Sequence, residues 1–304
     1  MLRIKHVMAR QLIRYLPVEG TEGIQWDDNE KTGQPIVGVR SVRVCHGEHV
    51  NCIQATYLLA DNSVHSSPTR GDDSAETESS FTLESDEAIV RVEGKLSGLR
   101  VGQVSFTTKT EKGEEKTHGP YGKTGEVGFG VEGYIVSFLG HSDVTLTSLG
   151  VYYLSPVLRS TGVGMCKGTP FEDPVWTLPV MRIKSVSVKH DSRVKAVQCT
   201  YDLLGGRQLT CSKHGRSDGD GLQSSAVELE DGETIVELKG RTDGTLIGQL
   251  MFVTKKKGGN GDKHYHGPFG TAGDTEFSVQ INGGVISLFG FSGDWIEGIG
   301  AYYV

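Results

Sequence analysis

Hydrophobic and polar residues alternate along most of this chain with a period of two. Val42 and Val44 share one parity, and after a turn Ile53, Ala55 and Tyr57 continue it. A period of two places such side chains on one face of an extended strand. Gly, Asn and Asp separate the alternating segments, as is typical of tight turns. The pattern therefore predicts short strands joined by turns.

The alternating pattern occurs twice. Residues 23–154 recur as residues 168–304, and the offset between matching segments grows only from 144 to 150 residues. The clearest matches are GQVSF (102–106) with GQLMF (248–252), HGPYG (118–122) with HGPFG (266–270), and LGVYY (149–153) with IGAYY (299–303). A solenoid unit has only ~20–50 residues. The repeat is therefore a duplicated domain.

Neither copy contains a capped amphipathic segment, so both are predicted to be all-β, with about 10–12 short strands each. Besides the strands around Val42 and Ile53 and their counterparts, those predicted in the first copy span 80–83, 88–93, 101–109, 126–131, 134–139 and 148–154. Those in the second span 226–229, 234–239, 247–255, 276–280, 285–289 and 298–304. We expect a basic N-terminal arm (1–19), a first domain (20–154), a connector (155–160) and a second domain (161–304). The connector is short, so the domains should pack together.

Charge excludes some classes of function. The net charge is −7, whereas a protein that follows nucleic-acid phosphates is expected to carry a basic stripe. The single basic run, Lys255–Lys257, sits beside glycines and is expected in a solvated loop. No apolar stretch approaches the ~18 residues that a membrane span needs. We expect neither nucleic-acid binding nor a membrane span.

The N-terminal arm carries four basic residues and no acid up to residue 16. It lacks the apolar core of a secretory signal. A mitochondrial leader is an alternative, although such leaders are usually rich in serine and this segment has none. We expect it to form an extra strand or short helix on the first domain. The absence of a signal predicts a cytoplasmic protein, with secretion by a route without a signal as the alternative.

Two pairs of cysteines are placed symmetrically about predicted turns. Cys45 and Cys52 are symmetric about the turn at 48–49, and Cys199 and Cys211 are symmetric about Gly205. Residues opposite one another on a hairpin have Cα atoms ~4.5–5.5 Å apart, which allows a disulfide. Two disulfides or buried reduced thiols both fit. Without a secretory signal, reduced thiols are favoured.

Four motifs occur in the same order in both copies. Each copy begins with GIQWDD (23–28) or GTPFED (168–173), continues through HGPYG or HGPFG, and reaches FLGHS (138–142) or LFGFSGDWIE (288–297) before the LGVYY or IGAYY strand. In this order the motifs resemble the jacalin-related lectins. The resemblance covers both copies and omits only the arm and the connector. It implies two β-prism domains in tandem, each of three four-stranded Greek-key sheets, that bind sugars without metal.

In that family the sugar lies between an N-terminal glycine loop and a G-x-x-x-D loop before the last strand. Clustered sugar hydroxyls need rigid backbone N–H donors, which are accessible where no Cβ intrudes. They also need a carboxylate that accepts charge-assisted hydrogen bonds. For the second copy the resemblance implies a carbohydrate-binding set formed by Gly168, Gly293, Asp294, Trp295 and Glu297. Glu297 stands where the family has aspartate. It keeps the charge with an altered reach.

The first copy departs further from the family pattern. Gly23 is kept, but Asp143 replaces the loop glycine and Thr147 replaces the carboxylate. A threonine hydroxyl is a weaker acceptor than a carboxylate. Asp143 could take the place of the missing carboxylate only if the loop rearranged. The corresponding residues, a weaker candidate site, are Gly23, Asp143, Val144 and Thr147.

Other candidate chemistry carries no clear pattern. His264 and His266 would point the same way on a strand, but no ligand spacing joins them, so a loop-facing pair is expected. Asp72–Asp73 and Asp218–Asp220 lack the twelve-residue calcium pattern and are expected as solvated turn acids. No spacing singles out a nucleophile with a base or a pair of carboxylates. We expect no metal, no cofactor and no enzymatic activity.

The sequence predicts a carbohydrate-binding lectin that is multivalent through its tandem domains. Its expected partners are glycans or glycoproteins, and a homodimer is a further option. Mannose-type sugars are preferred, because Gly168 lies within a continuous chain, and in this family a cleaved N-terminus accompanies galactose binding. The alternative is a structural or protein-interaction module whose sugar sites have decayed. That alternative rests on the replacements at Thr147 and Glu297.

Overall fold

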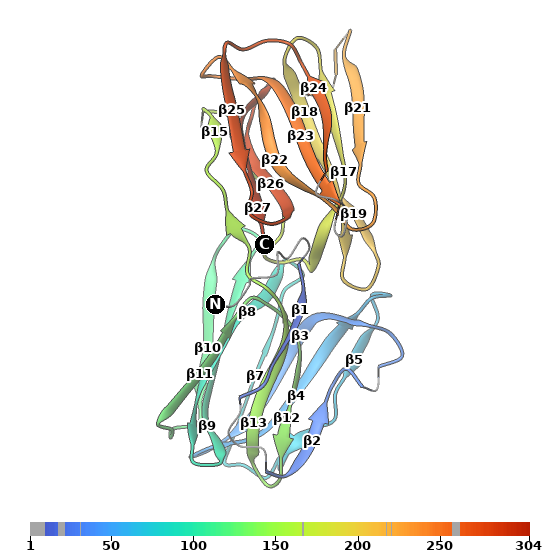
Figure 1. Ribbon diagram of the computed structural model, residues 1–304. Helices are drawn as coiled ribbons and strands as arrows, with labels where there is room; N and C mark the ends of the chain where they lie inside the picture. Colours follow the sequence, from blue (N-terminus) through green and yellow to red (C-terminus); the bar gives the residue numbers. More distant parts are fainter. Residues whose placement is uncertain are drawn as a thin grey trace.

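The computed structural model describes residues 10–17, 22–30, 32–165, 167–216, 218–219, 221–256 and 262–304. These residues form strands β1–β27 and no helix. Figure 1 shows two domains stacked end to end, the first copy (blue to green) below the second (yellow to red). The all-β prediction and the two-domain prediction are confirmed. Within the described chain there is no helix long and apolar enough to cross a membrane.

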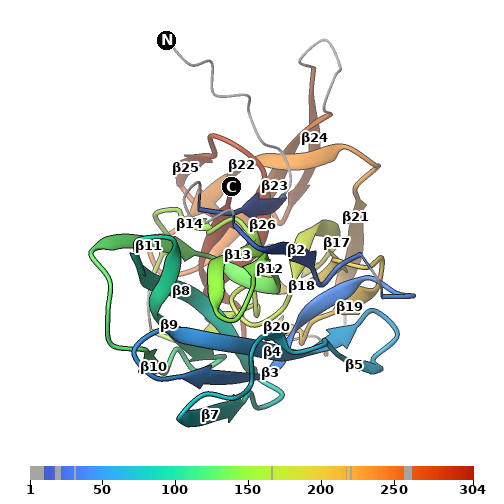
Figure 2. The same ribbon diagram turned by 90° about the horizontal axis from the view of Figure 1, so that it is seen from below.

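The first domain contains three antiparallel sheets, seen from below in Figure 2. The first sheet has the order β1 (Leu12–Tyr15), β13 (Leu146–Leu154), β12 (Tyr134–Ser142), β2 (Ile24–Asp27). The second has the order β10 (Glu115–Tyr121), β9 (Arg100–Thr110), β8 (Glu87–Ser97), β11 (Val127–Glu132). The third has the order β5 (Val64–Ser66), β4 (Val50–Leu59), β3 (Ile36–His46), β7 (Thr77–Thr82), with β6 (Arg70–Gly71) also on β4.

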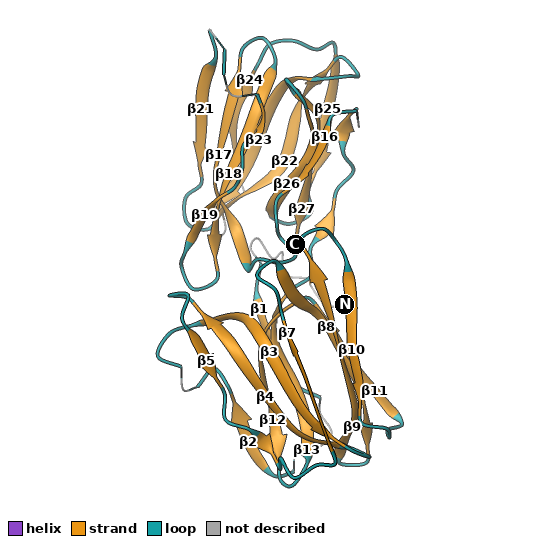
Figure 3. Cartoon of the chain, turned by 180° about the vertical axis from the view of Figure 1, so that it is seen from behind, coloured by secondary structure: helices purple, strands orange, loops and turns teal. Residues whose placement is uncertain are grey.

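The second domain repeats this arrangement, as the view from behind in Figure 3 shows. Its first sheet has the order β14 (Leu158–Arg159), β27 (Ile296–Tyr303), β26 (Val285–Ser292), β16 (Thr169–Glu172), with β15 (Val163–Gly164) also on β27. The second has the order β24 (Lys263–Phe269), β23 (Ile247–Lys256), β22 (Glu233–Thr242), β25 (Thr275–Gln280). The third has the order β19 (Gln208–Thr210), β18 (Val194–Leu203), β17 (Val180–His190), β21 (Gln223–Glu228), with β20 (His214–Gly215) also on β18.

Two of the three sheets in each domain have the Greek-key order. In β10-β9-β8-β11, three consecutive strands form hairpins and the fourth returns beside the first. The remaining sheet joins the beginning of each copy to its end. One hydrophobic core fills the space between the three sheets in each domain. Each domain is therefore a three-sided prism of the predicted kind.

The arm and the connector contribute strands to the prisms. Leu12–Tyr15 form β1 on β13, so this part of the arm is the expected extra strand on the first domain. Leu158–Arg159 form β14 on β27, so the connector extends a sheet of the second domain. Residues 1–9 and 18–19 of the predicted arm lie outside the described chain.

The two domains pack against each other through polar and apolar contacts. Arg10 is buried, and its Nη1 donates to the Val175 carbonyl at 2.9 Å while its Nε donates to the Ser155 carbonyl at 2.8 Å. Burial lowers the pKa of Arg10 to about 10. Across the junction, the Lys109 ammonium lies 5.2 Å from the centre of the Trp176 ring. The expected packing between domains is present.

Each core contains a buried carboxylate at the same place. In the first domain Tyr57 donates to Asp28 at 2.6 Å, and Arg70 forms an ion pair with it at 2.7 Å. In the second domain Tyr201 donates to Asp173 at 2.5 Å, and His214 Nε2 lies 2.8 Å from Asp173. Burial raises the pKa of Asp28, whereas hydrogen bonds from Tyr57 and Arg70 oppose the shift. The carboxylate connects the first strand of each copy to the neighbouring sheet.

We expect Arg70→Met to lower the free energy of unfolding by about 3 kcal/mol, because it leaves the Asp28 carboxylate buried without its cation. The double variant Asp28→Asn/Arg70→Met should recover part of that loss. Urea denaturation of the intact chain, followed by circular dichroism, measures both. Arg43→Met is the control: its ion pair with the exposed Glu78 should be worth less than about 1 kcal/mol. Equal losses for Arg70→Met and Arg43→Met would contradict the prediction.

A second prediction concerns acid stability. Burial alone would raise the pKa of Glu237, but hydrogen bonds from Gln280, Ser278 and Lys263 outweigh it, and the pKa lies below its ordinary value. Glu237 therefore stabilises the fold fully above its unfolded pKa of about 4.3, and this contribution is lost as the pH falls through the lower folded value. In urea denaturation, Glu237→Gln should be less stable than wild type at pH 7, with the difference shrinking toward pH 3. A pH-independent difference would contradict this.

Candidate functional site

The loop between β26 and β27 forms the centre of the candidate site in the second domain. Thr169 on β16 pairs with Ser292 at the end of β26, which places Gly168 beside Gly293. β27 runs from this loop to the C-terminus at the domain junction, so the loop lies at the far, upper end of the domain in Figure 1. The sheet that joins the beginning and the end of the copy thus brings the predicted residues together.

The two glycines make room for the Glu297 carboxylate. A Cβ on Gly168 would lie 3.0 Å from Glu297 Cδ and 2.6 Å from the Ser292 carbonyl oxygen. A Cβ on Gly293 would lie 2.9 Å from Glu297 Oε1. A side chain at position 168 would therefore collide with the backbone of Ser292, whereas one at position 293 would displace the Glu297 carboxylate. These close contacts are with the protein itself, whereas the sequence argument expected the glycines to leave backbone N–H groups accessible to a sugar; that role stays a prediction.

The Glu297 backbone is fixed while its carboxylate remains free. Gly293 N donates to the Trp295 carbonyl at 3.0 Å, and Met165 N donates to the Glu297 carbonyl at 2.9 Å. The Glu297 side chain is half-buried, and among the described residues no group donates a hydrogen bond to its carboxylate. Both oxygens can therefore accept from a ligand.

Charged residues from a neighbouring sheet surround the loop. The Lys195 ammonium on β18 lies 4.3 Å from the centre of the Trp295 ring, and it also pairs with Asp191 at 3.2 Å. Arg216 approaches Asp294 at 4.0 Å. Trp295 is half-buried, whereas Asp294 and Gly293 are exposed. The loop therefore presents to solvent its backbone at Gly293, the Asp294 carboxylate and part of the Trp295 ring.

The first domain has the same loop with different chemistry. Asp143 N donates to the Thr145 carbonyl at 3.0 Å, which matches the Gly293–Trp295 bond in the second domain. Gly23 has a φ of +88°, and a Cβ there would lie 2.6 Å from the Ser142 carbonyl oxygen. The loop keeps its conformation, so the rearrangement that Asp143 would need to replace the carboxylate has not occurred.

Thr147 in the first domain is not free to bind a ligand. Its side chain is buried, and its hydroxyl donates to the Glu22 carbonyl. Asp143 is exposed, and Val144, 57% exposed, adds an apolar tip to the loop. The first loop therefore lacks the acceptor that Glu297 provides in the second. The two loops therefore differ in the environment of this side chain as well as in its identity.

Comparison with known proteins identifies the family. The profile of the jacalin-like lectin domain matches residues 16–152 and 160–302. The chain belongs to the jacalin-like lectin family. The resemblance predicted from the four motifs is confirmed, and the prediction of a protein that is not an enzyme agrees with this membership.

Individual relatives resemble the chain more distantly. An agglutinin from Castanea crenata is 26% identical over 220 residues, which cover 65% of this chain and 68% of the agglutinin. A mannose/glucose-specific lectin from Parkia platycephala is 29% identical over 221 residues, which cover 67% of this chain but only 44% of that lectin. Among solved structures, Malaysian banana lectin is 26% identical, with a TM-score of 0.41, over 49% of this chain and 99% of its own.

The structure also shows where the remaining candidate residues, the two histidines and the turn acids, lie. His264 and His266 lie in strand β24 rather than in a loop, and His266 contacts Thr254 at 2.9 Å. Within the described chain no group of three His, Cys, Asp or Glu residues could hold a metal. Asp72 accepts a hydrogen bond from Ser74 N at 2.9 Å, as a turn acid does. Asp220 and Lys257 lie outside the described residues.

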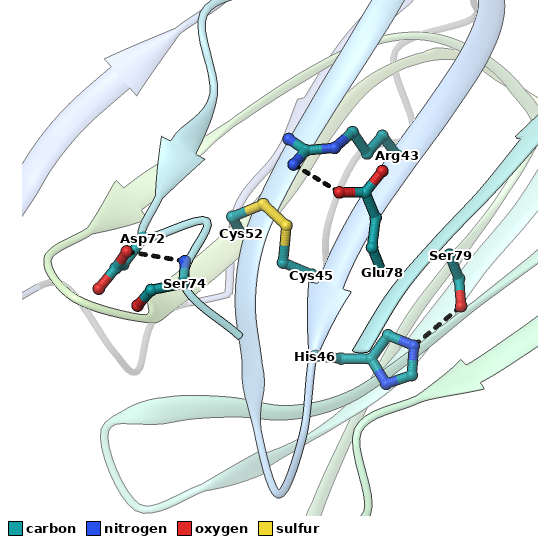
Figure 4. The surroundings of a disulfide bond; sticks show 8 residues. All are labelled: Arg43, Cys45, His46, Cys52, Asp72, Ser74, Glu78 and Ser79. Carbon is teal, nitrogen blue, oxygen red and sulfur yellow. Dashed lines mark hydrogen bonds and ion pairs between the residues drawn. A yellow bond between two sulfur atoms is a disulfide. The ribbon is translucent and has the colours of Figure 1, made fainter. Parts of the chain in front are cut away.

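The cysteine pairs differ between the two jacalin-like domains. Cys45 on β3 and Cys52 on β4 are directly opposite, with Cα atoms 4.8 Å apart, and form a disulfide, which Figure 4 shows beside the Arg43–Glu78 ion pair. Reduced thiols were therefore the wrong expectation for this pair. Cys199 and Cys211 are free and buried, as expected. Burial, followed by the charge of Asp173, raises the pKa of Cys211 to about 12.

Lys195 should restrain the Trp295 ring, because a cation over an aromatic face attracts it. We expect Lys195→Met to increase acrylamide quenching of Trp295 fluorescence, with no further increase in a Trp295→Phe background. Lys109→Met, which removes the cation over Trp176, is the matched control and should leave Trp295 quenching unchanged. Quenching that does not change in Lys195→Met would contradict a restraining role.

Proposed function

We propose that this chain binds glycans through the loop site of its second domain, without a metal ion. The observation that carries the proposal is the Glu297 carboxylate, which lies beside Gly168 and Gly293 and accepts no hydrogen bond from the residues that the structure describes. Adjacent sugar hydroxyls can donate to these oxygens, while exposed backbone near Gly168 and Gly293 supplies further polar groups. Membership of the jacalin-like lectin family supports the same chemistry.

We propose mannose-type sugars as the preferred ligands. Gly168 lies within a continuous chain, as the sequence argument requires, and the relative from Parkia platycephala is a mannose/glucose-specific lectin. Three or four hydrogen bonds of about 1 kcal/mol each correspond to a dissociation constant of roughly 1 mM. A single site is therefore weak, and useful binding requires several sites at once.

For the first domain we propose a structural or protein-interaction role. Its Thr147 hydroxyl is already occupied by the Glu22 carbonyl, and Val144 presents an apolar side chain where the second loop has Asp294. A partner bound there should not be displaced by free sugar. On this proposal only the loop of the second domain binds sugar, so one chain is not multivalent through its two loops. A homodimer remains the route by which two Glu297 sites could act together.

We expect Glu297→Ala to weaken binding to a mannose-coated surface by at least about tenfold, since hydrogen bonds to a charged group contribute about 1.5–3 kcal/mol. Glu297→Gln should retain part of the binding because it keeps one acceptor. Thr147→Ala in the first domain is the matched control and should bind like wild type. Surface plasmon resonance on densely mannosylated chips provides the measurement.

Two results would contradict the proposal. If Glu297→Ala binds as well as wild type, the sugar lies elsewhere. If a glycan array shows no binding by the intact protein, the second domain also acts as an interaction module.

A further inference from the structure

A shallow groove of about 500 Å³ crosses the outer face of sheet β24-β23-β22-β25 in the second domain. This sheet does not contain the β26–β27 loop, so the groove is separate from the loop site. In Figure 1 the four strands run side by side through the upper domain. The side chains used below are Lys239, Arg241, Gln249, Met251, Tyr265 and Ser278.

Strand alternation places these side chains on the outside. Leu238 and Phe252 are fully buried and pair across β22 and β23, so Lys239 and Met251, the next pair along, face outward. On the edge strand β24, Tyr265 is 59% exposed. Tyr265 therefore offers an exposed aromatic ring that a ligand can contact.

Several side chains of the groove differ from those at the same positions in the first domain. In the first domain, strand register places Glu93 and Ser105 where the second has Lys239 and Met251. Ser278, which pairs with Lys239, likewise corresponds to Gly130, which pairs with Glu93. Thr117 precedes the shared His-Gly-Pro segment where the second domain has Tyr265. The copies keep the same strands, and Lys95 and Phe129 stand where the second has Arg241 and Phe277. Only the second adds an aromatic ring on the edge strand and a lysine at the position of Glu93.

The charges in the groove favour an anionic ligand. Arg241 and Glu276 form an ion pair at 3.0 Å and neutralise each other. Lys239 is exposed, and among the described residues it has no acidic partner within ion-pair distance. Lys239 is therefore the uncompensated charge of the groove.

The dimensions and chemistry of the groove fit a sugar. From Tyr265 on β24 to Ser278 on β25 there are three strand spacings, about 14 Å, which exceeds the width of one pyranose ring. Tyr265 and Met251 offer an apolar surface for the C–H face of a ring. Gln249 and Ser278 supply donors and acceptors for hydroxyls. We propose that this groove is a second saccharide site, selective for sugars that carry a carboxylate, which Lys239 binds.

The test uses the intact protein with Glu297→Ala, so that the loop site does not contribute. The probe is a short oligogalacturonate, compared with a neutral oligomannose, and binding is followed by isothermal titration at low and high salt. We expect the acidic probe to bind and the neutral one to bind more weakly. Tyr265→Ala should weaken binding about tenfold, and Lys239→Gln about fivefold, with a smaller salt dependence. Tyr265→Phe, which keeps the ring, and Thr117→Ala, the first-domain counterpart, should leave binding unchanged.

The outcomes separate this site from the loop site. The groove is supported, even if the loop site binds no sugar, when Glu297→Ala binds the acidic probe and both Tyr265→Ala and Lys239→Gln weaken that binding. Equal binding of the acidic probe by all variants, or none by Glu297→Ala, overturns the proposal. Both changed side chains are exposed, so melting temperatures should stay near wild type. If Tyr265→Ala unfolds, Lys239→Gln and Lys239→Glu decide the question alone.

Discussion

The rest of this structure depends on one strand pairing in each copy. The strand at the beginning of the copy pairs with the second-last strand at its end. β2 pairs with β12, and β16 pairs with β26, so residues more than a hundred positions apart form one sheet. This pairing closes the third side of each prism and covers the core. It also determines where Gly168 meets Gly293. The candidate site is therefore a consequence of how the fold closes, and a ligand group held there is positioned by a sheet rather than by a flexible loop.

A buried carboxylate reinforces this closure in both copies, but by different means. Asp28 is held by the permanent cation of Arg70, which also lies 5.3 Å from the centre of the Trp26 ring. Asp173 is held by His214, whose ring stacks on Phe171 with centroids 4.1 Å apart. At Asp173 the contact with His214 is an ion pair only when His214 is protonated. After duplication the geometry of the core was thus retained, while its electrostatics diverged as much as the chemistry of the loops.

Most of the fold could be predicted because alternation and duplication support each other: each strand predicted in one copy has a counterpart in the other. β2 and β16 were not among the predicted strands. Neither were β10 and β24, each of which contains a Gly-Pro pair, and proline cannot donate to a sheet ladder. Both are edge strands with an irregular register at this point, so the missing donor costs no internal hydrogen bond. In the site, sequence identified the glycines and Glu297. It could not show that the Thr147 hydroxyl is occupied by Glu22, because that bond depends on the path of the backbone before Gly23.

The end-to-end stacking limits how this chain can bind several ligands at once. The β26–β27 loop lies at the upper end of the molecule and the β12–β13 loop at the lower end, with the domain junction between them (Figure 1). Avidity requires that two sites reach the same ligand surface together. Two loops that point in opposite directions cannot do so on one flat surface, even if both bound sugar. Loss of the carboxylate at Thr147 therefore removes little avidity. The groove proposed above lies on another sheet of the same domain as the Glu297 loop. Two sites in one domain do not face opposite ends of the molecule, so they are better placed than the two loops to contact one extended glycan.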